Sequence, residues 1–327
     1  MSAASAGTCP DCGSPVAAID NFCERCGHEL AIIRVSAGSP AAATCPGCAS
    51  SAMTADGYCE QCGYKAPSGR DHVEADLGSL AGVTDRGRRH PRNEDAMALA
   101  VTQTPAGPAT LAVICDGVSI SHRPDEASLA AAQTALQVMA AEVRAGTSAA
   151  DALLSAAAAA QKAVASMAEG SEDSPATTIV SACVSPDAVT VCWVGDSRAY
   201  WLPADRCDPR LLTRDDSLGE SLVAVGALTE AEVVESPHGH VLTRWLGADA
   251  DRFEPHTMSL EPPGPGTLLL CSDGLWNYEP RAAGLAELLP HAASENLADA
   301  IAALLEFALD RGGEDNITAV LASFPPR

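Results

Sequence analysis

Eight cysteines near the beginning of the chain form four Cys-x-x-Cys pairs, a spacing that suits metal binding. They are Cys9, Cys12, Cys23, Cys26, Cys45, Cys48, Cys59 and Cys62. Ten residues separate the two pairs of each quartet, and the second quartet repeats the first after 36 residues. Two thiolates on one tight turn occupy two corners of a Zn²⁺ tetrahedron, and a second turn supplies the other two. The sequence therefore predicts two structural zinc ions. Disulfides or free thiols are the alternative, and the odd total of 13 cysteines disfavours a disulfide framework.

Carboxylates form a second set of residues with the spacing of a chemical site. Six of them border apolar runs of strand length: Glu94, Asp95, Asp116, Asp196, Asp273 and Asp315. Any one Asp-Gly pair can simply begin a turn, but the repetition at strand ends suggests that these carboxylates gather. Carboxylates that gather without basic neighbours repel one another unless cations lie between them. Hard oxygen ligands favour Mg²⁺ or Mn²⁺, so the pattern predicts a site for divalent cations.

The elements that must position these carboxylates follow from the hydrophobic periodicity. Runs such as 110–115 and 267–271 have the length and composition of buried strands. Residues 125–144, 149–168 and 294–311 place apolar side chains at spacings of three and four, which predicts three amphipathic helices. Two strand layers with helices outside them satisfy this order of elements.

Charge and composition narrow the classes of function. The chain has 43 acidic and 20 basic residues and a formal net charge of −23. We therefore do not expect nucleic-acid binding through phosphate neutralisation. The first eight residues lack a charged start and an apolar run, and the apolar stretch 152–168 is interrupted by polar residues. We expect a cytoplasmic protein with no membrane partner.

Eight short motifs, in order along the chain, carry a family resemblance. They are TDRGRRHPRNEDA, ICDG followed by DEAS, TTIVSA, VGDSRAY, LTRDDSL, LTRWLG, LLLCSDGLW and GGEDNIT. They span about residues 80–324 and resemble the metal-dependent protein phosphatases of the protein phosphatase 2C (PPM) family, bacterial type. The resemblance implies an α+β fold, a four-layer sandwich of two antiparallel β-sheets flanked by α-helices. It also implies hydrolysis of phosphoserine and phosphothreonine.

Carried over by motif, the resemblance assigns the ligands of two Mn²⁺ or Mg²⁺ ions. Asp95 would be the first ligand, Asp116 would bridge the two ions, and the carbonyl of Gly117 would bind one of them. Asp273 and Asp315 would complete the set of ligands around the second ion. The reaction implied is in-line attack on phosphorus by a hydroxide held between the two metals.

The resemblance assigns further roles around this set. Glu94 would support Asp95 through water, and Asp196, with Asp273, matches a third and weaker metal of bacterial relatives. Cys115 and Cys271 precede site aspartates, but they lie within apolar runs and are expected in the core rather than as nucleophiles.

The loop before Glu94 departs from the family pattern. Aligned on NED, the phosphate-binding arginine of the family falls at His90, with Arg89 and Arg92 close by. An imidazole cannot offer the bidentate contacts of a guanidinium. We predict that Arg89 or Arg92 binds the phosphate beside His90; a solvated loop is the alternative.

The loop after Gly117 departs as well. Residues 118–123 replace a glycine-rich turn, and Val118 stands where eukaryotic relatives have a histidine general acid. Water, or His122 as a hypothesis, would then protonate the leaving group.

The cysteine runs look like the double zinc-ribbon modules of bacterial regulatory proteins. We expect ribbons at 1–35 and 41–66, a linker at 67–79 and a phosphatase domain at 80–327. A fold of about 25 residues cannot form a sufficient core alone, so zinc supplies its folding free energy. Basic residues in the ribbons are few, which favours regulation or an unknown protein partner over nucleic acid.

The sequence thus predicts a protein serine/threonine phosphatase with regulatory or recruiting ribbons. Its partners would be phosphoproteins, either a Ser/Thr kinase or the substrates of one. The changes at His90 and at 118–123 leave an alternative, a phosphoprotein-binding scaffold of the same fold without turnover. A nucleic-acid-binding ribbon protein is a third hypothesis, and the acidic balance counts against it.

Overall fold

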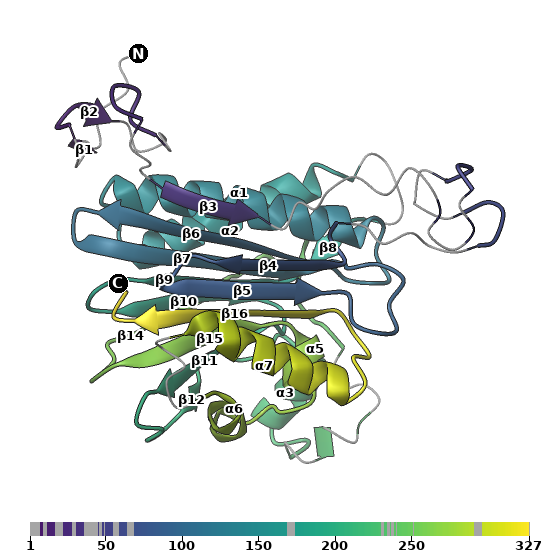
Figure 1. Ribbon diagram of the computed structural model, residues 1–327. Coiled ribbons are helices and arrows are strands. Elements are labelled where there is room, and N and C mark those ends of the chain that lie inside the picture. The colour runs from purple at the N-terminus through teal and green to yellow at the C-terminus, as the bar shows by residue number, and fades with distance from the viewer. Residues whose placement is uncertain are drawn as a thin grey trace.

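The apolar runs of the sequence form two six-stranded antiparallel sheets. The computed structural model describes residues 7–8, 12–16, 22–27, 31–35, 45, 48, 50–54, 59–63, 69–168, 174–229, 232–233, 236, 239, 241–250, 252–290 and 296–326, and only the backbone of 7–8 and 31–35. Figure 1 shows the two sheets with helices on their outer faces. The expected α+β fold class, a four-layer sandwich of two antiparallel sheets flanked by helices, is confirmed.

The strand order gives each sheet two edges. The first sheet has the order β14 (His256–Leu260), β10 (Val189–Val194), β9 (Ile179–Val184), β7 (Gly107–Asp116), β6 (Asp95–Thr104) and β3 (Ala31–Val35). The second has the order β12 (Arg210–Leu211), β11 (Arg198–Pro203), β15 (Gly266–Cys271), β16 (Ile317–Phe324), β5 (Leu80–Asp85) and β4 (His72–Asp76). Two short pairs stand apart: β1 (Gly7–Thr8) with β2 (Pro15–Val16), and β8 (Ala176–Thr177) with β13 (Leu246–Gly247).

The helices cover the outer faces of the two sheets. Helices α1 (Pro124–Arg144) and α2 (Ala149–Ala165) pack on the first sheet. Helices α5 (Asp273–Trp276), α6 (Ala282–Leu288) and α7 (Leu297–Asp310) pack on the second. Helix α3 (Leu218–Ala224) lies in the segment between β12 and β13. No helix in the described ranges is long and apolar enough to cross a lipid bilayer.

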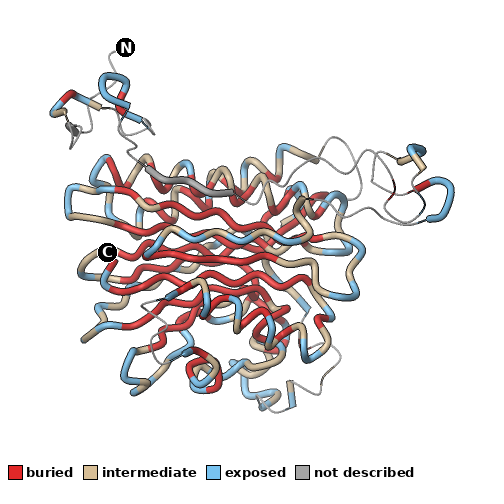
Figure 2. Tube along the Cα trace, viewed as in Figure 1, coloured by how far each residue is buried: buried red, intermediate tan, exposed pale blue. Residues whose placement is uncertain are grey.

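The core consists of three apolar layers, one between the sheets and one under each set of helices. Figure 2 shows that the buried residues follow the strands of both sheets. The period of two along each strand divides side chains between these layers. In β6, Ala98 and Ala100 face α1, whereas Met97 and Leu99 face the other sheet. Because both faces of the central strands are covered, these strands are apolar throughout, as their sequence suggests.

The strand directions bring the acidic residues to one end of the sandwich. Asp95 begins β6 and is the register partner of Asp116, which ends β7. Strand β15 ends just before Asp273, and Asp315 lies two residues before β16. This end, called the catalytic end below, is on the right in Figure 1.

The first and second sheets each gain an edge strand from the N-terminal region, where we expected ribbon or linker. Ala31–Val35, assigned to the first ribbon at 1–35, pairs with β6 as β3. His72–Asp76, assigned to the linker at 67–79, pairs with β5 as β4. A sheet edge has unpaired N–H and C=O groups, and pairing them is the physical reason for this difference.

Candidate active site

Asp95 is held on one side by a hydrogen-bonded serine. Ser272 donates a hydrogen bond from Oγ to Oδ2 of Asp95 at 2.8 Å, and the N–H of Thr318 donates to Ser272 Oγ at 3.0 Å. The other oxygen of Asp95, Oδ1, is buried and has no hydrogen-bond partner among the described residues. A buried oxygen that is left without a donor suits a cation ligand.

Asn316 ties the loops at this end together. Its Oδ1 accepts the N–H of Glu94 at 2.7 Å, and its Nδ2 donates to the carbonyls of Arg86 and Arg92 at 2.8 and 3.0 Å. Asp315 accepts the N–H of Asn316 at 2.7 Å, so one buried amide fixes two ligand-bearing loops. Sequence reasoning missed Asn316 as a positioning residue, although it stands directly after Asp315.

Two glycines let the backbone approach closely beside the aspartates. A Cβ atom on Gly117 would lie 2.5 Å from the carbonyl oxygen of Pro124 and 2.7 Å from that of Glu94. A Cβ on Gly274 would lie 2.0 Å from the carbonyl oxygen of Asn316. Both contacts are far closer than a methyl group tolerates, so the site requires glycine at these positions.

The carboxylates lie so close together, and are so deeply buried, that their pKa values are raised. Burial, and then the charges of Asp95 and Asp273, hold the pKa of Asp116 well above its ordinary value. Burial, and then the charges of Asp196 and Asp315, do the same to the pKa of Asp273. Burial raises the pKa of Asp95 to about 6. Divalent cations would remove this cost of ionisation, so this donor set fits Mn²⁺ or Mg²⁺.

Asp196 lies in the turn between β10 and β11, where its own pKa is also raised. Burial, and then the charge of Asp215, raise the pKa of Asp196 to about 7. Trp276 donates from Nε1 to the carbonyl of Asp196 at 3.0 Å. The N–H of Gly195 donates to Oδ2 of Asp216 at 3.0 Å, so Asp216 fixes the loop of Asp196.

The basic residues before Glu94 divide into two groups. His90 lies with Nε2 3.1 Å from Oδ1 of Asp315, and Arg92 donates from Nε to Oε1 of Glu94 at 2.8 Å. Arg89 instead pairs with the exposed Glu314 at 2.9 Å. His90 and Arg92 therefore reach the carboxylates, whereas Arg89 is directed to a surface pair.

Three other residues singled out in the sequence are a loop histidine and two cysteines that neighbour site aspartates. His122 is exposed. Cys115 and Cys271 are fully buried, and burial raises the pKa of each thiol far above its usual range. These two cysteines therefore pack in the core, as expected.

The cysteine quartets gather as their spacing predicts, within the residues that the structure describes. The thiol sulfurs of Cys45, Cys48, Cys59 and Cys62 lie within 4.8 Å of one another, as do those of Cys12, Cys23 and Cys26. Cys9 lies outside the described residues. Gly27 and Gly63 follow matching cysteines and have φ of 74° and 73°, so the two turns repeat the same backbone geometry.

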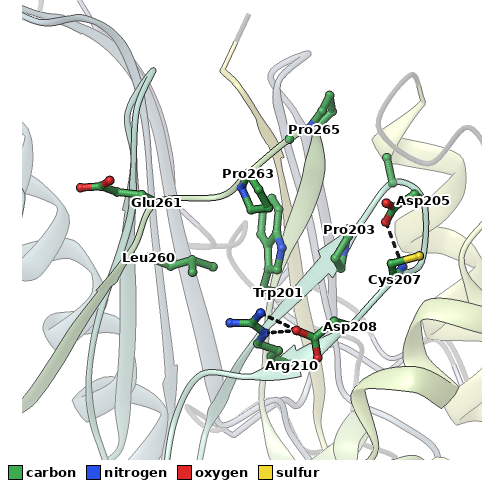
Figure 3. A pocket seen from close by; sticks show the side chains of 12 residues that line it. Trp201, Pro203, Asp205, Cys207, Asp208, Arg210, Leu260, Glu261, Pro263 and Pro265 are labelled. Atoms are coloured by element: carbon green, nitrogen blue, oxygen red, sulfur yellow. Dashed lines mark hydrogen bonds and ion pairs between the residues drawn. The ribbon is translucent and has the colours of Figure 1, made fainter.

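A separate cavity of about 510 Å³ lies at the end of the sandwich away from the carboxylates (Figure 3). It is lined by Trp201, Pro203, Leu260, Pro263 and other residues, and Arg210 pairs with Asp208 at its rim. Pro203 is the register partner of Gly266, whereas the opposite ends of these strands, Arg198 and Cys271, border the site. This cavity is therefore not part of the candidate active site.

Comparison with known proteins agrees with this geometry. The family model described as protein phosphatase 2C matches residues 84–318, and the double zinc ribbon model matches residues 9–63. The chain is similar to the serine/threonine phosphatase stp of Listeria innocua serovar 6a, with 36% identity over 145 residues, 44% of this chain and 55% of that protein. The chain thus matches about half the length of this curated relative.

Solved structures agree over more of the chain. The serine/threonine phosphatase Stp1 of Staphylococcus aureus is 25% identical, with a TM-score of 0.64 over 77% of this chain and 98% of that one. The catalytic domain of the serine/threonine protein phosphatase PstP, in complex with two manganese ions, is 25% identical, with a TM-score of 0.57 over 75% and 97%. The chain therefore belongs to the protein phosphatase 2C family.

Proposed function

We propose that this chain is a Mn²⁺- or Mg²⁺-dependent phosphatase of phosphoserine and phosphothreonine in proteins. The observation that carries the proposal is the convergence of Asp95, Asp116, Asp273 and Asp315 at one end of the sandwich, with Oδ1 of Asp95 lacking a donor among the described residues. The PstP catalytic domain holds two manganese ions, and retention of the whole acidic set supports an equivalent pair here.

The four aspartates and the Gly117 carbonyl would hold the two ions, with Glu94 supporting Asp95. When bound, the cations activate water and stabilise charge on the phosphate oxygens. Asp196 and Asp273 would hold a third ion, which the charge of Asp196 on Asp273 supports.

Arg92 is the residue that we propose for binding the phosphate. Its guanidinium contacts Glu94 and its side chain is 41% exposed, so it is close to the ligands and open to substrate. A guanidinium binds two phosphate oxygens at once. His90 would add one further contact from beside Asp315. Water would protonate the leaving group, because Val118 has no proton to give and His122 is exposed.

We propose that the second zinc ribbon acts on access to the site, because both of its chain connections are at the catalytic end. Strand β3 ends at Val35 opposite Ala98, three residues from Asp95, and β4 begins at His72 opposite Asp85. Cys62 precedes Arg70 by eight residues, so it lies at most about 28 Å from it. The ribbon could thus recruit a phosphoprotein or restrict its approach.

The test is phosphate release from a phosphothreonine peptide with Mn²⁺, with Mg²⁺ and with EDTA. Metal-dependent turnover that disappears in Asp273→Asn would establish the activity. A chain in which a Gly/Ser linker replaces residues 41–66 keeps β3 and β4 and isolates the effect of the second ribbon. Phosphopeptide binding without turnover at any Mn²⁺ concentration would instead support the scaffold hypothesis.

A further inference from the structure

The segment that replaces the family's glycine-rich turn forms one wall of an apolar cavity. Residues 118–121 line it together with Ser174, Ala176, Val241, Leu242, Trp245 and Asp249, and the volume is about 510 Å³. Pockets of about 300–1,000 Å³ are the usual size of specific binding sites. We call this cavity the 118–121 groove.

Residues that line the 118–121 groove, or stand next to it in the chain, are bonded to residues of the carboxylate site. Val118 directly follows Gly117, and its N–H donates to the carbonyl of Ala176 at 3.0 Å. Ser119 donates from Oγ to Oε2 of Glu94 at 2.6 Å. Next to Ala176 in the chain, Thr177 donates from Oγ1 to the carbonyl of Asp116 at 2.8 Å. A peptide with its phosphate at the carboxylates would therefore have the groove beside it.

Two apolar side chains at the rim of the groove are largely exposed to solvent. Ile120 is 96% exposed and Val241 is 48% exposed. Trp245 adds an aromatic surface, and its Nε1 donates to Asp249 at 3.0 Å, which orients the ring. Apolar surface that is gathered in this way beside a reaction site favours a partner that covers it.

The charged residues that line the groove indicate the chemistry of the group that can bind there. Asp249 is the one ionisable residue that lines it within the described part of the chain, and no basic residue does so. A second phosphate or an acidic side chain would therefore find no counter-charge there. An apolar side chain would instead cover Ile120 and Val241.

We infer that the 118–121 groove binds an apolar side chain of the phosphoprotein substrate, a few residues from the phosphorylated residue. This inference rests on the proposed phosphatase activity and names the class of substrate that the site prefers. The loop that departs from the family's glycine-rich turn is thereby a specificity element.

The first arm of the test uses phosphothreonine peptides that differ at one position. Leucine is placed in turn at each of four positions on either side of the phosphothreonine in an otherwise serine-rich peptide, and kcat/KM is measured with Mn²⁺. At one position leucine should raise kcat/KM about tenfold over serine, as burial of such a side chain allows. Aspartate at the same position should give no increase.

The second arm locates this preference in the groove. In Ile120→Ser/Val241→Ser the leucine preference should fall to about twofold or less, whereas Ile120→Leu should retain it. The matched control is Val225→Ser, since Val225 is 76% exposed but does not line the groove. Its leucine preference should equal that of the unaltered chain.

Three outcomes would overturn the inference. Equal kcat/KM for leucine, serine and aspartate peptides would remove the preference and leave the proposed activity intact. A leucine preference that survives in the double variant would place its origin elsewhere. Failure to release phosphate from any peptide, or from para-nitrophenyl phosphate, would remove the proposed activity and the groove's role with it.

Discussion

Arg70 donates a hydrogen bond from Nη2 to the backbone carbonyl of Asp95 at 3.1 Å. The same guanidinium donates from Nη1 to the carbonyl of Asp125 at 2.8 Å, in the first turn of α1. Its own carbonyl accepts a hydrogen bond from Asn93 at 3.0 Å. Arg70, at the end of the connection from the second ribbon, thus contacts the backbone of a candidate metal ligand and the start of α1. These hydrogen bonds link the connecting segment directly to the site.

Replacing Arg70 by Met should loosen Asp95 without removing a ligand. We expect the Mn²⁺ concentration for half-maximal activity to rise about tenfold, because a charged hydrogen bond contributes about 1.5–3 kcal/mol. The measurement is a Mn²⁺ titration of phosphate release, and Arg70→Lys should restore part of the loss. Arg206→Met is the control, since Arg206 also donates to a carbonyl, that of Leu289, outside the site. An unchanged Mn²⁺ titration in Arg70→Met would show that the contact does not position Asp95.

Replacing Arg92 by Ala should weaken substrate binding. We expect KM for the phosphothreonine peptide to rise about tenfold or more, because a guanidinium contact to phosphate is lost. Arg89→Ala, which removes a surface pair with Glu314, should change KM by about twofold or less. If Arg89→Ala has the larger effect, the assignment of the phosphate contact is wrong.

Asn316→Ala should destabilise the loops at the catalytic end. It removes three side-chain hydrogen bonds from a buried position, and leaves the N–H of Glu94 without its acceptor. We expect a loss of about 2–4 kcal/mol in unfolding free energy, measured by urea denaturation with Mn²⁺ present. Asn277→Ala is the control, because Asn277 is exposed and makes one long contact of 3.3 Å with Asp273. A loss below about 1 kcal/mol would contradict the role of Asn316.

Stability without divalent cations should fall as the pH rises. An acid with a higher pKa in the folded chain than in the unfolded chain binds its proton more strongly when folded. The unfolded pKa is about 4, whereas the folded values are about 6 for Asp95 and about 7 for Asp196. The stability contributed by these protons is present in full below about pH 4, falls as the pH rises above that value, and is lost once the pH has passed about 6 for Asp95 and about 7 for Asp196.

Urea denaturation in EDTA at pH 5.5 and pH 8 measures this trend. Asp196→Asn should reduce the slope between these values, and saturating Mn²⁺ should abolish it, because the cations replace the protons. Asp187→Asn, in the exposed turn between β9 and β10, should leave the slope unchanged. A metal-free chain that is more stable at pH 8 would contradict this electrostatic account.

The zinc content should be two ions per chain. Cys59→Ser removes one sulfur of the second cluster, so we expect atomic absorption to find about one ion fewer. Cys115→Ser alters a core cysteine and should retain both ions. Equal zinc in Cys59→Ser and the unaltered chain would show that this cluster is not a zinc site.

The main elements of the fold could be predicted because they carry their own periodicity. The helices expected at 125–144 and 149–168 are Pro124–Arg144 and Ala149–Ala165, and the helix expected at 294–311 is Leu297–Asp310. Strands β3 and β4 were missed, since five-residue segments such as AIIRV and HVEAD acquire their structure from the sheet edge that they join.

In the site, too, some residues could be identified from the sequence and others only from the fold. The carboxylates could be singled out because their chemistry is visible at strand ends. Arg70 and Asn316 could not, since their roles depend on carbonyl groups brought near by the fold. The sequence left Arg89 and Arg92 equivalent, and only their partners, Glu314 and Glu94, separate them.

The edge strand β3 also sets an order of events during synthesis. Ala31 pairs with Thr102, so β3 has no partner until about 70 further residues have left the ribosome. Both cysteine quartets are complete well before that point. Metal can therefore bind to the cysteines first. The first sheet is completed later, when β6 has been synthesised and pairs with β3, which was translated before it. A chain beginning at residue 77 would lack both N-terminal edge strands and expose β6 and β5 to pairing between molecules.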